Sequence, residues 1–400
     1  MLRVKYCVLI LDGASGWPLE EFGGRTCLEL ARKPNLDLLA SQGTLGLVRT
    51  VPPGMEASSA CACLSILGYD PRIYYTGRGP IEAHSLGLRL EEGEVAFRCN
   101  LVTIREGRMW SYSAGQITSA ESHELIVALN LNLGNSRVSF YPGVGYRHIC
   151  TIKEGEEHLK AICTPPHEIP DKPIADFLPR GEGSELLLQL MERSWEVLEK
   201  HPVNLHREKQ GKPPANFIWL FWGGRRAPEL PRFSELYGLS AALTSGVDLL
   251  QGLAKLSRME VLSIPGVTAG LDNDHAAQAE GALAALERHD LVFIHIEAPD
   301  EAAHEGRVKE KVETIERIDR EVISLFLSRK ELRVLVLPDH PTPVKLRTHA
   351  PDPVPFLIWG PGVGRSQAKA FSEREAQGTG LFLERGHELL KFLLEPKKFR

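Results

Sequence analysis

The stretch LRVLVLPDHPTPVKLRTHAPDPVPFLIWG, residues 332–360, decides the fold. Its apolar, β-branched run at 334–337 has the length of a buried strand, and a proline ends the run directly before Asp339 and His340. In open α/β sheets, sites form in the crevice at the carboxyl ends of the strands. This strand therefore brings a carboxylate and an imidazole, two metal-ligand groups, to the edge of the sheet where sites form.

The loop after this strand carries a further ligand-type side chain, His349, before a second apolar run at 354–359. Together these residues are interpreted as half of a metal site. The alternative is that Asp339 and His340 only cap the strand with turn hydrogen bonds, as such residues commonly do. An Asp-His dipeptide alone does not separate the two interpretations, so the rest of the chain has to decide between them.

The composition is that of a soluble globular protein and excludes several classes of partner. The chain has 400 residues, of which 43% are hydrophobic and 25% charged, and its net charge is -5. This balance gives no basic field for nucleic acid or anionic lipid, and the apolar runs are too short to span a membrane. We expect no nucleic-acid partner, no membrane insertion and a cytoplasmic location. Whether copies of the chain form a homo-oligomer stays open.

Two other predicted strands end in the same way. The run at 6–11 is followed by Asp12, and the run at 291–296 is followed by Asp300 and His304. If a helix begins after the second run, the four-residue spacing of Asp300 and His304 puts both side chains on one face, where they can hold one cation. A lone Asp-Gly pair, as at the first of these ends, usually marks a turn. Three strands with such endings nevertheless indicate a shared site.

A serine pair stands at the start of a predicted helix of small residues. Ser58 and Ser59 follow a Pro-Pro-Gly loop, and the helix continues to Leu67. A serine hydroxyl at a helix N-terminus, facing metal-binding carboxylates, is placed to accept a phosphoryl group that the helix amides and dipole help to hold. The alternative is an ordinary N-cap serine, which is the commonest reason for serine at this position.

Two arginines lie in segments that suit anion binding. Arg78 lies in the glycine-rich segment YYTGRGP, and Arg98 lies in FRCN at the end of another predicted strand. Arginines bind phosphate or carboxylate through two parallel hydrogen bonds, which makes a cluster of them a candidate substrate site. They serve equally often as surface ion-pair partners, so both interpretations stay open.

The rhythm of the predicted elements divides the chain into two domains. After residue 172, strand and helix patterns alternate at the spacing of parallel βαβ units. Residues 88–171 instead carry short alternating segments around one helical pattern, and the proline-rich segment at 164–173 is interpreted as the return linker. We therefore predict an α/β catalytic domain formed by residues 1–87 and 172–400, with a smaller α+β domain inserted at 88–171.

Long strings of the sequence carry a more specific signal than these patterns. They are LDGASGWP, LGYDPRIYYTGRGPIEA, VAFRCNLVTI, SAGQITS, FYPGVGYRH, TPPHEIPDKPI, HPVN, HIEAPDEAAHEG and VLPDHPTPVKLRTHAPDPVPF. Through these strings, which extend over nearly the whole chain, the sequence resembles the archaeal-type, cofactor-independent phosphoglycerate mutases of the alkaline phosphatase superfamily. It is most similar to a bacterial and archaeal branch of that family that also carries a provisional homoserine kinase label.

The resemblance implies a fold and an activity. The implied fold is an alkaline-phosphatase-like, mostly parallel sheet with helices on both faces, interrupted by a smaller domain that closes over substrate. The implied activity is the interconversion of 3-phosphoglycerate and 2-phosphoglycerate, which are small phosphorylated metabolites. In the family this transfer passes through a phosphoserine intermediate and needs no 2,3-bisphosphoglycerate.

Carried over motif by motif, the resemblance also implies the ligands of two divalent cations and a group of substrate arginines. One cation would be held by Asp300, His304 and His349, and the other by Asp12, Asp339, His340 and the nucleophile Ser59. The residues implied to hold phosphate or carboxylate are Arg78, Arg98 and Arg147. Aspartate and histidine ligands suit manganese or zinc better than magnesium alone.

The serine segment departs from the family pattern. The family usually has Pro-Gly-Ser-Asp, then an asparagine, before LSLLGYDP, and counting back from the shared LGYDP string places its serine at Ser59. The neighbouring glycine, acid and asparagine are replaced by Ser58, Ala60 and Cys63, and Gln278 stands where the family has a lysine. Transfer to another small metabolite, hydrolysis by metal-bound water, or a catalytically silent paralogue that binds metal are therefore alternatives to mutase activity.

Overall fold

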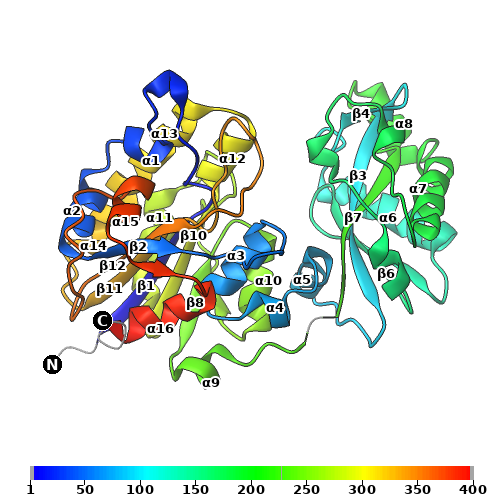
Figure 1. The fold of residues 1–400 in the computed structure, drawn as a ribbon. Helices are drawn as coiled ribbons and strands as arrows, with labels where there is room; N and C mark the ends of the chain where they lie inside the picture. Colours follow the sequence, from blue (N-terminus) through cyan, green and yellow to red (C-terminus); the bar gives the residue numbers. More distant parts are fainter. Residues whose placement is uncertain (1–3, 227, 397–400) are drawn as a thin grey trace. The chain divides into compact units, whose positions relative to one another are not determined.

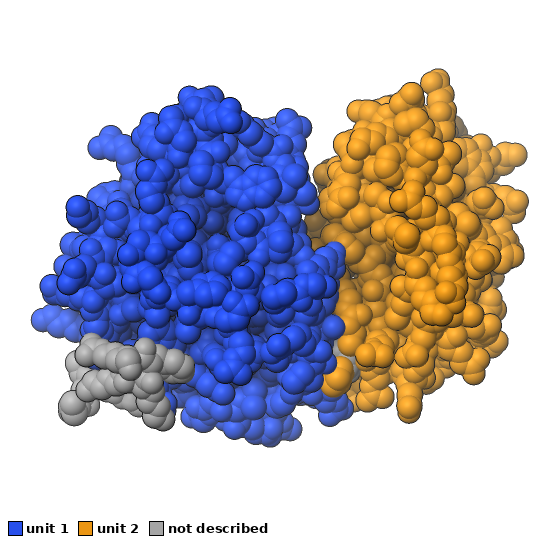
Figure 2. Space-filling model, viewed as in Figure 1, with its two compact units in different colours: residues 1–75, 229–400 blue, residues 76–228 orange. Residues whose placement is uncertain are grey.

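The computed structural model describes residues 4–226 and 228–396, and the chain separates into two compact units. Unit 1 comprises residues 1–75 and 229–400, and unit 2 comprises residues 76–228 (Figure 2). Within the described ranges, the structure has no helix that combines the length and the apolar character needed to cross a membrane.

Unit 1 is built on an eight-stranded sheet in the order β13-β2-β12-β11-β1-β10-β8-β9. The strands are β1 (Lys5–Leu11), β2 (Thr44–Val48), β8 (Ala241–Thr244), β9 (Glu260–Val261), β10 (Leu291–Ile296), β11 (Leu332–Leu337), β12 (Val354–Trp359) and β13 (Phe382–Leu383). The block from β11 to β9 is parallel, whereas β12 runs antiparallel to both of its neighbours. The predicted mostly parallel α/β sheet is confirmed.

Helices cover both faces of this sheet (Figure 1). On one face, α2, α11 and α13 share an apolar core with alternate residues of the central strands. These helices span Pro34–Gln42, His275–Ala285 and Val308–Ile318. On the other face, the ring of Phe293 in β10 lies 5.8 Å from the ring of Phe233, the first residue of α9 (Phe233–Tyr237). Because both faces are covered, the central strands are apolar along almost their whole length.

Unit 2 has a five-stranded antiparallel sheet with helices packed against it. The long central strand β3 pairs with β4, β6 and β7, and β5 extends the sheet beyond β6. The strands are β3 (Val95–Arg105), β4 (Arg108–Ser111), β5 (Val138–Tyr141), β6 (Arg147–Ile152) and β7 (Phe217–Arg225). The helices are α5 (Arg78–Ser85), α6 (Ser119–Leu133), α7 (Glu185–Leu198) and α8 (Pro202–Lys209).

Unit 2 is longer than the inserted domain predicted from the sequence. The predicted insertion was 88–171, whereas the observed unit runs from Thr76 to Pro228. The segment at 164–173 lies inside unit 2 and is not a return linker. The helix and strand that follow it, α7 and β7, have the alternation expected of the larger domain, but β7 pairs with β3 over Val95–Val102. Local pattern gave their type correctly and could not give their pairing partner.

Candidate active site

The Asp-Gly turn after β1 draws three chain segments together. Asp12 is fully buried, and Gly13 follows it with φ of +59°. A Cβ atom at Gly13 would lie 2.2 Å from Oδ1 of Asp300, so a side chain cannot be accommodated there. The Gly13 amide also donates a hydrogen bond of 3.1 Å to Oδ1 of Asp339. The turn therefore places Asp12 against the residues that follow β10 and β11.

A first group of ligand atoms forms around the helix that follows β10. This helix, α12 (Ala298–His304), carries Asp300 and His304 one turn apart, with Oδ2 and Nε2 separated by 2.9 Å. Nε2 of His349 lies 3.0 Å from Nε2 of His304 and 3.6 Å from Oδ2 of Asp300. The structure thus brings together the three side chains that the sequence analysis assigned to one cation.

A second group forms around His340, directly after β11. Nε2 of His340 lies 3.1 Å from Oγ of Ser59, 3.2 Å from Oδ2 of Asp339 and 3.6 Å from Oδ1 of Asp12. All four side chains are buried. Donor atoms of Asp12, Asp339 and His340 fall within 4.8 Å of one another, as do those of Asp300, His340 and His349. His340 therefore lies between the two predicted ligand sets.

The two serines of the predicted helix start have different partners. Helix α3 (Ser59–Ile66) begins at Ser59, and Ser58 is its N-cap, whose hydroxyl accepts a 3.4 Å hydrogen bond from the Cys61 amide. The hydroxyl of Ser59 instead points to His340. The N-cap interpretation thus applies to Ser58, and Ser59 is the serine that contacts the ligand groups.

Each of the three imidazoles is held at Nδ1, so that Nε2 faces the centre. The Nδ1 partners are the Arg347 carbonyl for His304 (2.9 Å), the Ala57 carbonyl for His349 (3.1 Å) and the Thr342 hydroxyl for His340 (3.2 Å). A carbonyl oxygen can only accept, so Nδ1 carries the hydrogen in His304 and His349. Their Nε2 atoms lie 3.0 Å apart beside Asp300, and this carboxylate, against the opposing effect of burial, raises the pKa of His304 to about 9 and that of His349 above its ordinary value. A hydrogen bond at Nδ1 is the arrangement that orients the Nε2 atom of a histidine toward a metal.

The electrostatics of this centre also fit a cation. Burial, together with Asp339, Glu297 and Asp300, raises the pKa of Asp12 well above its ordinary value. Oδ1 of Asp12 is buried and has no hydrogen-bond partner among the described residues. Burial lowers the pKa of His340 to about 4, which keeps its imidazole neutral, as a metal ligand must be. Crowded carboxylates, imidazoles and a serine oxygen are a donor set suited to divalent cations.

The predicted arginines gather in unit 2. Arg98 is buried and forms an ion pair with Glu82, and Arg78 donates from Nε to the same carboxylate at 2.7 Å. Arg147, at the start of β6, is close enough that its charge lowers the pKa of Arg98, after the larger effect of burial. Although burial acts in the opposite direction, Arg98 and Arg78 bring the pKa of Glu82 to about 2.

An aromatic residue completes this arginine cluster. The guanidinium of Arg78 lies 4.1 Å from the centre of the Trp222 ring, in cation–π geometry. Trp222 has φ of +48°, an uncommon conformation for a non-glycine residue, close to the point where the pairing of β3 with β7 is irregular. Strained backbone of this kind clusters at binding sites, and it is a feature that the sequence did not reveal.

Two residues beside the first strand end were missed by the sequence analysis. His295, at the end of β10, places Nε2 2.8 Å from Oδ2 of Asp12 and 3.7 Å from Oε2 of Glu297. The signal was present, because both residues stand in the string HIEAPD between a buried strand and Asp300. Gln278, at the position where the resemblance implies a lysine, is buried in α11 and donates a 2.9 Å hydrogen bond to the carbonyl of His295.

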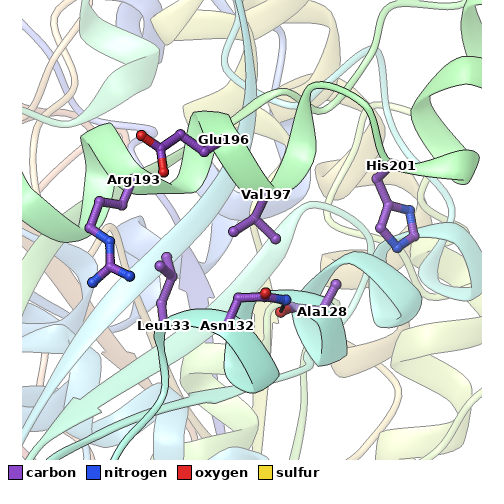
Figure 3. Close-up of a pocket in the computed structure, with 7 residues that line it drawn as sticks. All are labelled: Ala128, Asn132, Leu133, Arg193, Glu196, Val197 and His201. Carbon is purple, nitrogen blue, oxygen red and sulfur yellow. Dashed lines mark hydrogen bonds between the residues drawn. The ribbon is translucent and has the colours of Figure 1, made fainter.

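A concave pocket in unit 2 contains none of these residues. Its volume is about 350 Å³, and it lies between α6 and α7 (Figure 3). It is lined by Ala128, Asn132, Leu133, Arg193, Glu196, Val197 and His201. Because its walls carry neither the predicted ligands nor the arginine cluster, the candidate site rests on the side-chain groups above.

Comparison with known protein sequences places the chain in one family. A family model described as 2,3-bisphosphoglycerate-independent phosphoglycerate mutase matches residues 40–204. A curated protein of that name from Methanothrix thermoacetophila is 49% identical over 396 residues, which is 98% of this chain and 100% of the relative. Another of that name, from Methanosarcina barkeri, is 44% identical over 400 residues and has the same coverage.

Solved structures agree with this placement. A protein of known structure from Pyrococcus horikoshii superposes with a TM-score of 0.80 and 32% identity, covering 100% of this chain and 99% of its own. A cofactor-independent phosphoglycerate mutase from Thermoplasma acidophilum superposes with a TM-score of 0.63 and 27% identity, covering 98% and 99%. The identity of the sequences over their full lengths, and the shared fold, show that this chain belongs to the family of 2,3-bisphosphoglycerate-independent phosphoglycerate mutases.

Proposed function

We propose that the chain interconverts 3-phosphoglycerate and 2-phosphoglycerate through phosphorylated Ser59, without 2,3-bisphosphoglycerate. The observation that carries this proposal is the 3.1 Å approach of the Ser59 hydroxyl to Nε2 of His340, among buried carboxylates at the carboxyl edge of the sheet. The names of the relatives support it, because these proteins are full-length matches to this chain.

The buried ligand groups divide between two divalent cations in this proposal. One set is Asp300, His304 and His349, and the other is Asp12, Ser59, Asp339 and His340. When bound, such cations polarise the phosphoryl oxygens and favour the ionised form of the serine oxygen. Manganese or zinc fits these nitrogen and oxygen donors better than magnesium.

The chain's own residues carry the transfer. The Ser59 oxygen forms a bond to phosphorus as the ester bond to the 3-oxygen of the substrate breaks, and the serine proton goes to that leaving oxygen. Glycerate then turns, its 2-oxygen bonds to phosphorus, and the bond from phosphorus to Ser59 breaks. The proton of the 2-hydroxyl returns to Ser59. Water is not a reactant in this transfer. The amides at the start of α3 help to hold the phosphoryl oxygens.

Substrate binding falls to unit 2 in this proposal. Arg78, Arg98 and Arg147 bind the phosphate and carboxylate of the substrate. The charge of the cluster supports this role, because Glu82 is the ion-pair partner described for both Arg78 and Arg98. One carboxylate cannot neutralise the two guanidinium groups of Arg78 and Arg98, so this pair keeps positive charge for an anion.

A coupled assay for 2-phosphoglycerate formation tests the proposal. Metal-stripped protein resupplied with manganese should turn over, and Ser59→Ala should lose at least roughly a thousandfold in kcat, since it removes the nucleophile. Ser58→Ala is the matched control: it removes an N-cap and should cost about 1 kcal/mol of stability but not the reaction. Undiminished turnover by Ser59→Ala would overturn the assignment, and release of inorganic phosphate in place of isomerisation would indicate a hydrolase.

A further inference from the structure

The hydrogen bonds around Asp12 suggest a role for a histidine that is not among the proposed ligands. We infer that His295, supported by Ser245, is a positioning residue for Asp12. It holds one carboxylate oxygen of Asp12, so that the other oxygen faces the proposed cation. The inference rests on the proposed cation centre and goes beyond it, because neither residue belongs to either ligand set. His295 acts through Asp12 and touches no substrate.

A continuous chain of buried hydrogen bonds reaches Asp12 from the loop after β8. Nε2 of His295 lies 2.8 Å from Oδ2 of Asp12, and Nδ1 of His295 lies 3.0 Å from Oγ of Ser245. The Val247 amide in turn donates a 3.0 Å hydrogen bond to the oxygen of Ser245. His295, Ser245 and Asp12 are all buried, so water does not compete for these contacts.

The direction of every hydrogen bond in this chain follows from Asp12. An aspartate that binds a cation is ionised and can only accept, so Nε2 of His295 must be the donor. The other nitrogen of a neutral imidazole is then an acceptor, so the hydroxyl of Ser245 donates to it. Ser245 keeps a lone pair for the amide of Val247. The serine thereby selects the tautomer of His295 that can bind the carboxylate.

The two oxygens of Asp12 consequently have different surroundings. Oδ2 is tied to His295, whereas Oδ1 is buried without a hydrogen-bond partner among the described residues. Oδ1 lies 3.6 Å from Nε2 of His340, on the side of the proposed second cation. A carboxylate fixed at one oxygen presents the other at a defined position, which is the usual effect of an outer hydrogen bond on a metal ligand.

The backbone of His295 is fastened as well. Gln278 donates from Nε2 to the carbonyl of His295 at 2.9 Å, and its own carbonyl accepts a 2.9 Å hydrogen bond from Asn273. A neutral amide satisfies both partners, so a glutamine serves where the family has a lysine. The imidazole is therefore held at both ring nitrogens and at its own main chain.

The inference predicts an effect on one cation only. Asp300, His304 and His349 receive no hydrogen bond from the chain through His295, and two of them are oriented by the carbonyls of Arg347 and Ala57. Loss of His295 should therefore loosen Asp12 and leave the other cation in place. A competing arrangement makes His295 itself a ligand, because donor atoms of Asp12, His295 and Glu297 lie within 4.8 Å of one another.

Equilibrium dialysis of manganese against the full-length, metal-stripped protein separates these cases. The wild type should bind two ions, and His295→Phe, which keeps the ring and removes the donor, should weaken one of them by roughly 10–100-fold. His295→Gln restores a donor and should recover most of the affinity, whereas Ser245→Ala should lose less than His295→Phe. His275→Phe is the control, because it removes another fully buried imidazole of unit 1, whose described side-chain partner is Glu321 at 3.5 Å and not a proposed cation ligand.

The unfolding temperature of the metal-free proteins is the second readout. The inference requires that His295→Phe weaken one ion while its metal-free unfolding temperature stays close to that of the His275→Phe control. Equal weakening of both ions together with a lower metal-free unfolding temperature would overturn it in favour of a structural role. If both manganese affinities were unchanged in His295→Phe, the inference about His295 would be overturned but the cation centre would not. The same would follow if the wild type bound a third ion that His295→Phe lost, because His295 would then itself be a ligand. A wild type that binds no manganese would overturn the cation centre itself.

Discussion

The proposed cation centre of unit 1 and the arginine cluster of unit 2 both bury charged side chains, but they balance this charge in different ways. In unit 1, the ion-pair partners described for Asp12, Asp300 and Asp339 are all histidines. In unit 2, Glu82 lies between two arginines that each bond to it. The positive charge of the first group comes only from histidines, because Asp300, against the opposing effect of burial, raises the pKa of His304 to about 9. The second group instead contains the permanent charges of arginines.

A buried lysine makes this contrast sharper. Lys311 lies close to the centre of unit 1, but its ammonium donates to the carbonyls of Ser15 and Thr342 and not to a carboxylate. It ties together the loops after β1 and β11 without pairing with Asp12 or Asp300. Within the described residues, this ammonium fixes loop geometry and forms no ion pair with the carboxylates, so their charge is balanced by histidines and, in the proposed centre, by bound cations.

Removal of metal should therefore have the largest effect and should act on unit 1. Chelation should abolish turnover, and readdition of manganese should restore it. Each bound cation at a thousandfold excess over its dissociation constant adds about 4 kcal/mol to the free energy of unfolding. Hydrogen exchange measured by mass spectrometry should show faster exchange in β1, β10 and β11 after chelation, with β3 and β6 unchanged. Equal loss of protection in both units would contradict the contrast.

Glu82→Gln should have the next largest effect and should act on unit 2. It leaves the buried guanidinium of Arg98 and the partly buried one of Arg78 without their carboxylate, so the free energy of unfolding at neutral pH should fall by roughly 3 kcal/mol. Urea unfolding measures this change. Glu91→Gln is the matched control, because it removes an exposed carboxylate paired with Lys153 and should change stability by less than about 1 kcal/mol.

The pH dependence gives a second test of the same ion pairs. Because the pKa of Glu82 in the folded protein is about 2, below its value of about 4.3 in unfolded chains, its contribution is complete above pH 4.3. The contribution is lost as the pH falls from there toward 2. The difference in stability between wild type and Glu82→Gln should therefore shrink over this range. A difference that stays constant down to pH 2 would show that the ion pairs do not stabilise unit 2.

The sequence predicted those features of the fold that depend on neighbouring residues, and it did not predict those that depend on contacts between distant segments. The runs at 291–296 and 354–359 coincide with β10 and β12, because a buried apolar strand between polar turns is visible residue by residue. Asp12, Asp339 and His340 could be singled out as candidates for the same reason, since they follow closely after the buried strands β1 and β11. The place of β7 was not predictable, because its partner β3 lies more than a hundred residues earlier in the chain.

The same distinction applies to the residues of the site: a role that depends on neighbouring sequence could be predicted, and one that depends on distant segments could not. The choice of Ser59 over Ser58 followed from counting back along a motif, and the structure places Ser59, not Ser58, beside His340. The role inferred for His295 could not be read from the sequence, because its partners come from the loop after β8 and from the end of β1. A histidine at the end of a buried strand has no sequence signature that separates a structural residue from a positioning one.

The smallest expected effect belongs to Cys63, which replaces the asparagine of the family pattern. Its thiol donates to Oδ2 of Asp339 across 3.8 Å, and burial keeps its pKa well above the ordinary value, so the group stays protonated. A thiol is a weak donor, and loss of such a contact is worth about 0.5 kcal/mol. Cys63→Ala should therefore lower kcat/KM by no more than roughly threefold, and Cys61→Ala, the control on the same helix, should lower it less.

Cys63→Asn tests the same contact in the other direction. An amide is a stronger donor than a thiol, so it should hold Asp339 at least as firmly, and kcat/KM should equal or exceed that of the natural chain. A loss of a hundredfold or more in Cys63→Ala would instead mean that the sulfur contacts the reacting groups directly. The cation centre would then contain a soft ligand in addition to its oxygens and imidazoles, and the balance of affinities would shift from manganese toward zinc.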